Sequence, residues 1–343
     1  MLHYFSPKKG ILLFSVIVFI LNACSYVVQP QESNCIAYRA AFDVGSATTK
    51  MKVARVNKCL QKNEAIIYKN EIKVPYAENK RSGFFSQEIR NTGTIALQKL
   101  KDEAINNRAE VFSGVATESF RQASDTMEFL REVQEKTGIS IKLIDQDQEA
   151  ILGYLAACDA FPDSTRNVIV WDIGGASMQM ILRKKNREFL IYRGIIASIS
   201  FKEKILVQIM QQKPEKHLSP NPIGKENLKK ATEIASAAAG DVPEDIRNVF
   251  SEPNTVILGI GGVHNESIKK QLKSNARYTQ EELIDALNAR IGLNDKDIGG
   301  QYADTEISNM ILVLGFMEKL GIKEVIPVNV NLADGVLIEP AFW

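Results

Sequence analysis

The chain is poor in the residues that most often build transition-metal sites, and it has no charge excess of either sign. Its 343 residues include only 3 His and 4 Cys, without C-x-x-C or H-x-x-x-H spacing, which argues against a zinc enzyme. The 42 Lys and Arg balance 41 Asp and Glu, so no overall field attracts duplex nucleic acid, which we exclude as a partner. With 45% hydrophobic and 24% charged residues, the chain is long enough for roughly two domains with cores of their own.

Long apolar runs are also scarce, and the clearest one lies at the N-terminus. Residues 11–21 (ILLFSVIVFIL) follow Lys8 and Lys9 and have the length of a signal-peptide core, too short for an ordinary membrane-spanning helix. Residues 21–24 (LNAC) resemble the bacterial lipobox. We therefore expect residues 1–23 to be removed, Cys24 to be lipidated and residues 24–35 to form a tether. Ser25 after the cysteine favours the outer membrane, facing the periplasm of a bacterial cell envelope.

Two cysteines flank a predicted β-hairpin. Strand patterns at 36–43 and 50–56 surround a turn near 46–48, which places Cys35 and Cys59 opposite each other. In an oxidising compartment such a pair is suited to a disulfide. Two free thiols remain the alternative.

A repeat at an offset of 129 residues is the strongest architectural feature. Residues 42–51 (FDVGSATTKM) recur as residues 171–180 (WDIGGASMQM), each between apolar strand-like segments. Further strand patterns at 64–74 and 187–193 follow, and helical patterns come next. The repeat predicts an α/β fold with two duplicated domains that face each other across a cleft.

Each copy of the repeat supplies groups that can bind phosphate. Glycine lets backbone N–H groups approach one anion because it lacks Cβ, and a neighbouring hydroxyl adds a donor. An Asp beside that anion makes sense as a ligand of Mg²⁺, which offsets the phosphate charge. The expected phosphate-binding residues are Gly45, Ser46, Thr48, Gly174, Gly175, Ala176 and Ser177, and the expected metal ligands are Asp43 and Asp172.

The paired turns resemble the phosphate loops of the actin/hexokinase/Hsp70-like superfamily. Within it, residues 116–125 (ATESFRQASD) resemble the A-T-x-x-x-R-x-A-x-[ND] segment of the exopolyphosphatase/guanosine pentaphosphate phosphatase (Ppx/GppA) family. Residues 144–154 (IDQDQEAILGY), 259–263 (GIGGV) and 332–337 (LADGVL) fit other motifs of that family in order. The resemblance covers about residues 36–343. It implies actin-like (ribonuclease H-like) domains and Mg²⁺-dependent release of terminal phosphate from polyphosphate or guanosine pentaphosphate.

The resemblance also implies roles for individual residues. Glu149 matches the family's catalytic glutamate and would act as the general base that activates water. Taken alone, it could equally be an exposed acid near a helix N-terminus. Arg121 would bind phosphate oxygens bidentately, with a surface ion pair as the alternative. Gly261 and Gly262 would form a third phosphate-binding turn.

The second turn departs from the family pattern D-I-G-G-G-S-T-E at Ala176, Met178 and Gln179. Gln179 can orient water or a metal-bound group, but it cannot act as an anionic ligand. The resulting D-I-G-G-A-S-x-Q pattern resembles the loop of ecto-apyrases, so hydrolysis of nucleoside tri- or diphosphates stays open. A catalytically weak lipoprotein that binds phosphate or nucleotide stays open as well.

The motif order defines the expected domains. Residues 36–146 plus about 330–343 form actin-like domain I, and residues 147–329 form domain II. The family includes dimers, so a homodimer is carried as an alternative. Removal of residues 1–23 leaves 40 basic and 41 acidic residues. A polyanionic substrate must then be attracted by the local loops, Arg121 and Mg²⁺, which favours short phosphate chains.

Overall fold

The computed structural model describes Met1 and most of the chain from Cys35 onward. The described ranges are 35–77, 83–161, 163, 165–175, 177–272, 276–300 and 302–343. The expected signal peptide and lipidation site at Cys24 lie outside them, as does Ala176. Residues 35–343 form one unit, and within the described part of the chain no helix is long and apolar enough to cross a membrane.

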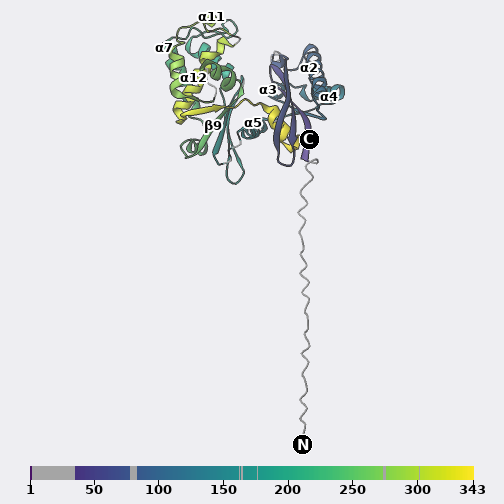
Figure 1. Cartoon of the computed structure of the whole chain (residues 1–343). Helices are drawn as coiled ribbons and strands as arrows, with labels where there is room; N and C mark the ends of the chain where they lie inside the picture. The colour runs from purple at the N-terminus through teal and green to yellow at the C-terminus, as the bar shows by residue number, and fades with distance from the viewer. Residues whose placement is uncertain are drawn as a thin grey trace. The chain divides into compact units, whose positions relative to one another are not determined.

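The first half is built on a five-stranded sheet in the order β3-β2-β1-β4-β5 (Figure 1). The first three strands form an antiparallel meander, and the last two join in parallel. Its strands are β1 (Ile36–Val44), β2 (Thr48–Asn57), β3 (Lys62–Lys73), β4 (Val111–Ala116) and β5 (Ser140–Leu143). Its helices are α2 (Gln87–Asn106), α3 (Glu118–Gln122) and α4 (Thr126–Thr137).

The second half repeats this plan on a six-stranded sheet in the order β10-β11-β9-β6-β7-β8. Its strands are β6 (Asn167–Ile173), β7 (Met178–Arg183), β8 (Phe189–Gly194), β9 (Thr255–Ile260), β10 (Tyr278–Thr279) and β11 (Glu324–Pro327). The helices from the crossover onward are α5 (Gln146–Ala160), α6 (Ser198–Lys204), η2 (Ile205–Ile209), α7 (Lys225–Ala239), α8 (Glu244–Val249), η3 (Val263–Ile268), α9 (Lys269–Leu272), α10 (Gln280–Asn288), α11 (Asp295–Ile298), α12 (Ala303–Leu320), α13 (Leu332–Ile338) and η4 (Pro340–Phe342).

The core of the second half explains its most apolar helix. α12 is buried around nearly its whole circumference, with Leu312 and Phe316 fully inaccessible. Such a helix needs packing partners on every side. The small residues of α7 supply one of them, because the Cβ of Ala235 lies against Gly315 of α12.

Equivalent hydrogen bonds establish the duplication at atomic level. The Gly45 amide donates to the Thr48 carbonyl over 3.0 Å, and the Gly174 amide donates to the Ser177 carbonyl over 2.9 Å. Across the strands Asp43 faces Lys50, and Asp172 faces Gln179. Both registers agree with the 129-residue offset. The predicted α/β fold of two duplicated actin-like halves is therefore confirmed.

The C-terminal helix α13 returns to the first sheet and packs beside α5. Arg39 of β1 donates from Nη1 to the Leu337 carbonyl over 2.7 Å, and Lys52 of β2 forms a buried ion pair with Asp334. A Cβ on Gly335 would lie only 2.3 Å from the Leu152 carbonyl oxygen. Glycine at this point lets α13 and α5 approach closely.

The start of the described unit is cross-linked to the β2–β3 turn. Cys35 and Cys59 form a disulfide with a Cα separation of 5.2 Å. The Lys58 amide also donates to the Cys35 carbonyl over 2.8 Å. The first strand is thus covalently fixed to its neighbouring hairpin.

Candidate active site

Glu149 lies where the two halves meet, in the first turn of α5. The helix begins at Asp145, whose carboxylate accepts the Gln148 amide over 2.8 Å in a capping box. Only 8% of Glu149 is exposed. Its Oε2 accepts Nη1 of Arg121 over 2.9 Å, and its Oε1 accepts the Ser177 hydroxyl over 3.3 Å. The glutamate therefore links α3 of the first half to the phosphate turn of the second.

Arg121 directs its donors to carboxylates and a carbonyl. Besides Glu149, Nη1 contacts the Ile144 carbonyl over 3.0 Å, while Nη2 and Nε contact Oε2 of Glu118 over 2.7 and 3.2 Å. The sequence favoured a bidentate contact with phosphate. In the structure the bidentate face of the guanidinium lies against Glu118, so Arg121 orients Glu149 and keeps an opposite charge beside it.

Three carboxyl groups of the site interact electrostatically, and Lys50 acts on two of them. Burial raises the pKa of Asp172 to about 7, with neighbouring Glu149 and Asp43 adding to the rise and Lys50 opposing it. Burial also raises the pKa of Glu149, against the effect of Arg121. The pKa of Asp43 is raised by burial as well, and Lys50 again opposes the shift. The predicted metal ligands and the predicted base thus share one electrostatic environment.

Lys50 was missed in the sequence, although the repeat contained a signal for it. It occupies the position in the first copy that Gln179 occupies in the second. Strand pairing places each of them opposite an Asp. The two halves therefore present a cation and a neutral amide at equivalent points of the site.

Gln179 is a buried side chain that lacks partners. It is 1% exposed, and within the described chain neither its Oε1 nor its Nε2 has a hydrogen-bond partner. Native proteins rarely leave both atoms of a buried amide unsatisfied, because each costs desolvation energy. Its position beside Asp172 is that of a group completed by a ligand or by ordered water.

In the first two turns, backbone carbonyls accept hydrogen bonds from elsewhere in the protein, while the amides of the same residues do not bond to backbone carbonyls within the described chain. The Ser46 carbonyl accepts the Ala77 amide, and the Gly175 carbonyl accepts the Ile199 amide, each over 2.9 Å. The amides of Ser46 and Gly175 donate to no backbone carbonyl of the described residues. Thr48 begins β2 directly behind the first turn. An anion bound at either turn can accept hydrogen bonds from these oriented amides.

The third predicted turn lies directly against Asp172. Gly261 has φ +85°, and a Cβ there would lie 2.4 Å from Oδ1 of Asp172. Glycine is therefore required for this approach. Gly262 follows it with open space around its Cα. Asp43 and Lys50, which flank the first turn, act electrostatically on the same Asp172 carboxyl, whereas Ala176 of the second turn lies outside the described residues.

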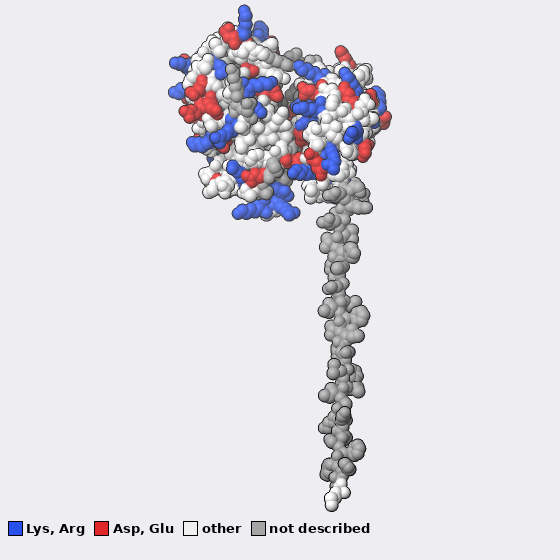
Figure 2. Space-filling model, viewed as in Figure 1, with Lys and Arg blue, Asp and Glu red and all other residues white. Residues whose placement is uncertain are grey.

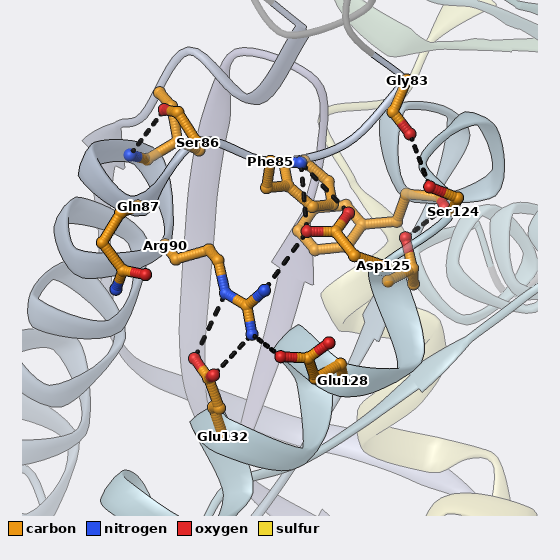
Figure 3. Close-up of polar contacts among 12 residues, drawn as sticks. Gly83, Phe85, Ser86, Gln87, Arg90, Ser124, Asp125, Glu128 and Glu132 are labelled. Carbon is orange, nitrogen blue, oxygen red and sulfur yellow. Dashed lines mark hydrogen bonds and ion pairs between the residues drawn. The ribbon is translucent and has the colours of Figure 1, made fainter.

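A second arginine braces the corner that carries Arg121. Arg90 of α2 lies between Asp125, Glu128 and Glu132, with its Nη1 3.3 Å from Oδ2 of Asp125 (Figure 3). Asp125 also accepts the Phe85 amide over 3.0 Å. The motif at residues 116–125 ends at Asp125 but assigns this residue no role. The contacts show that it fastens the chain leading into α2 to the α3–α4 corner.

The two duplicated halves define a fold that several solved structures share. An Aquifex aeolicus Ppx/GppA family structure is similar with a TM-score of 0.73 and 18% identity, covering 88% of this chain and 97% of that one. A Cytophaga hutchinsonii exopolyphosphatase structure gives 0.65 and 14%, covering 88% and 96%. A nucleoside triphosphate hydrolase of Neospora caninum gives 0.56 and 10%, covering 86% and 88%. At these identities the likeness concerns the fold.

The sequence model of the Ppx/GppA phosphatase family matches residues 65–339, and the chain belongs to this family. A bifunctional 3-dehydroquinate synthase/phosphatase of Fusobacterium nucleatum is 24% identical over 325 residues, covering 87% of this chain and 46% of that protein. A Haemophilus influenzae protein provisionally named as an exopolyphosphatase is 28% identical over 158 residues, covering 46% and 47%. The chain thus spans about half the length of these curated relatives.

Proposed function

We propose that the protein hydrolyses phosphoanhydride bonds and releases the terminal phosphate of polyphosphate or of a guanosine pentaphosphate-type substrate. The observation that carries this proposal is the position of Glu149, buried between Arg121 and the Ser177 hydroxyl of the second phosphate turn. Membership of the Ppx/GppA family supports the reaction class. The contacts of Glu149 support its role as the base.

In this mechanism Glu149 removes a proton from water as the water oxygen attacks the terminal phosphorus. The anhydride P–O bond breaks on the opposite side, and its electron pair leaves with the shortened phosphate chain. The ion pair over 2.9 Å with Arg121 fixes the orientation of Glu149. Free amides of the turns and Lys50 stabilise negative charge on the transferred group. The raised pKa of Glu149 makes it a better proton acceptor than an exposed glutamate.

The residues present fit the Mg²⁺ that the family resemblance implies. Asp172 and Asp43 offer hard oxygen ligands, and the unpartnered Gln179 amide lies next to Asp172. Across the part of the chain that is described, no group of three or more His, Cys, Asp or Glu is arranged to hold a metal alone. Mg²⁺ sites that bind phosphate substrates use one or two carboxylates together with substrate oxygens and water. When bound, the ion would neutralise phosphate charge.

A second candidate function is hydrolysis of nucleoside tri- or diphosphates. The observation in its favour is Gln179, which replaces the family's acid in an apyrase-like turn and is poised to orient a group by hydrogen bonds. A third alternative is a lipoprotein that binds phosphate with little turnover, because the family's acid is replaced by Gln179. The test below includes this outcome. A pure binder has no need of the held base at Glu149.

The test is phosphate release by residues 25–343 with Mg²⁺ from polyphosphate, guanosine pentaphosphate, ATP and ADP. Glu149→Gln should lower turnover by roughly 10²-fold or more and leave substrate binding nearly unchanged. Asp147→Asn is the matched control, since it neutralises a half-buried acid in the same turn of α5 that pairs with Arg193 and not with Arg121. Release from ATP and ADP alone would replace the first proposal with the second. Binding without release from any substrate would refute both.

We further propose that Cys24 is lipidated and anchors the protein in the bacterial envelope, in the outer membrane facing the periplasm. The lipobox-like residues 21–24 and the apolar run before them support this proposal. Metabolic labelling with a radiolabelled fatty acid should mark the full chain and not its Cys24→Ser variant. Equal labelling of both chains would show that the lipid is attached at another residue. If neither chain were labelled, the proposed lipid anchor would be refuted.

A further inference from the structure

Each half presents a hairpin turn at the end of its sheet opposite to its phosphate turn. Strands β2 and β3 are joined by residues 58–61, and strands β7 and β8 by residues 184–188. Along β7, Gln179 and Arg183 are four residues apart, about 13 Å at roughly 3.3 Å per residue. Both turns therefore lie away from the phosphate-binding groups, and Figure 1 draws them at the lower edge of the two sheets.

The β7–β8 turn is strongly basic. Arg183, Lys184, Lys185 and Arg187 fall within five residues, and three of them are exposed while Lys184 is half-buried. The turn has a defined shape, because the Arg187 amide donates to the Lys184 carbonyl over 2.9 Å. Figure 2 shows Lys and Arg gathered at the lower edge of the half built on the six-stranded sheet.

Nearby acids do not cancel this charge. Lys184 lies 3.5 Å from Asp245, and Glu188 is the only acid within the turn itself. Counting both carboxylates against the four cations leaves an excess of two positive charges. A patch of this kind attracts an extended anionic surface, and salt screens the attraction because the cations are exposed.

The β2–β3 turn adds an apolar tip and the point of attachment. Leu60 is 72% exposed between exposed Lys58 and Lys62. Cys59 in the same turn is bonded to Cys35, the first residue of the unit 35–343. The segment that leads back to Cys24 is thus covalently fixed to this turn. An exposed leucine flanked by lysines suits the boundary between lipid headgroups and acyl chains.

We infer that the two turns form a second contact with the membrane and bind anionic lipid headgroups. The inference rests on the proposed anchor at Cys24 for its location, because residues 25–34 span at most about 35 Å when extended. Lipid chains fix a protein to a surface without fixing its orientation, and basic groups near the surface supply that second signal. This contact directs the phosphate turns away from the membrane, toward substrates in the aqueous compartment.

The experiment uses residues 25–343, which retain the four hydrophobic clusters found in the described unit. Cosedimentation is measured with phosphatidylcholine vesicles and with vesicles that also contain phosphatidylglycerol, at low and high salt. The triple variant K184Q/K185Q/R187Q should bind the anionic vesicles roughly a hundredfold more weakly. Leu60→Ser should weaken binding severalfold on its own.

The matched control is K225Q/K229Q/K230Q on α7, which removes the same charge from another exposed face. It should retain vesicle binding. Equal losses in the two triple variants, or binding that ignores phosphatidylglycerol, would overturn the inference. The K184Q/K185Q/R187Q variant should release phosphate at the normal rate, so failure of the proposed hydrolysis is distinguished from failure of membrane contact. If this variant instead lost polyphosphate binding and kept vesicle binding, the turn would be a substrate site.

Discussion

Replacing Asp172 by Asn should stabilise the protein above pH 7 while abolishing phosphate release. In the folded chain, burial and the nearby Glu149 raise the pKa of Asp172 from an ordinary value of 3.8 to about 7. A raised carboxyl pKa means that the folded state binds the proton more tightly than the unfolded state does. Stability is therefore lost as pH rises from about 4 to about 7, and the full penalty is present above pH 7.

The size of the effect follows from the shift. About three pKa units at 1.36 kcal/mol each give an upper limit near 4 kcal/mol. Because Asp172 is only partly buried in the described structure, solvent screening reduces this, and we expect a gain of about 2 kcal/mol for Asp172→Asn at pH 8. At pH 4 the two proteins should differ by less than about 0.5 kcal/mol, since the wild-type carboxyl is then protonated.

The assay is urea unfolding at both pH values in the presence of EDTA. The chelator removes divalent cations, which would bind the Asp172 carboxylate and turn the expected gain in the free energy of unfolding into a loss. Asp43→Asn is the matched comparison, because the equivalent carboxyl also has a raised pKa but faces Lys50 and accepts the Leu332 amide. The gain in the free energy of unfolding at pH 8 should therefore be smaller for Asp43→Asn than for Asp172→Asn. A loss of stability for Asp172→Asn at pH 8 would refute the reasoning, because it would show that the carboxylate is stabilised in the fold without metal.

Arg121→Met should lower the free energy of unfolding by about 3 kcal/mol at pH 8 and cut turnover, because Glu149 loses its buried partner; urea unfolding and phosphate release check this, and an unchanged turnover would remove Arg121 from the site. Cys35→Ser removes a disulfide of sequence separation 24 and should lower the free energy of unfolding by about 3 kcal/mol in the same assay. If reducing the disulfide of the wild type left its free energy of unfolding unchanged, this prediction would be contradicted. Gln179→Glu distinguishes two roles of this position: a higher Mg²⁺-dependent rate of phosphate release would show that Gln179 stands in for a metal-site acid, and an unchanged or lower rate would show that the amide is the adapted residue. Chelation of Mg²⁺ should abolish phosphate release, measured before and after adding the ion back.

The repeat was sufficient to predict the fold because each of its copies combines the pattern of a β-strand with a glycine turn. Both features are local, and the Gly45–Thr48 and Gly174–Ser177 hydrogen bonds confirm them. The position of Glu149 at a helix start was predictable for the same reason. Its contact with Ser177 was not, since it joins residues of two different halves and depends on how α5 crosses between them.

The role of Arg121 shows where sequence reasoning reaches its limit. A motif specifies an arginine, but an arginine fork fits carboxylate and phosphate equally well. Only the placement of Glu118 three residues earlier on α3, and of Glu149 on α5, decides between them. The Lys52–Asp334 ion pair was invisible for another reason: its partners are far apart in sequence and meet through the return of α13 to the first sheet.

The difference between Lys50 and Gln179 determines how an anion can be held at the site. Asp43, Asp172 and Glu149 place three carboxyl groups in one electrostatic neighbourhood, and Arg121 is already engaged by Glu118 and Glu149. Among the described residues, Lys50 is then the cation whose influence reaches both aspartates. A polyphosphate chain would meet net negative charge there unless a divalent cation or a proton accompanied it. A fourth acid in place of Gln179 would increase that repulsion. In the proposed reaction the neutral amide would lower the charge that the accompanying cation must offset, so that Mg²⁺, Lys50 and the turn amides would be sufficient to hold a short polyanion.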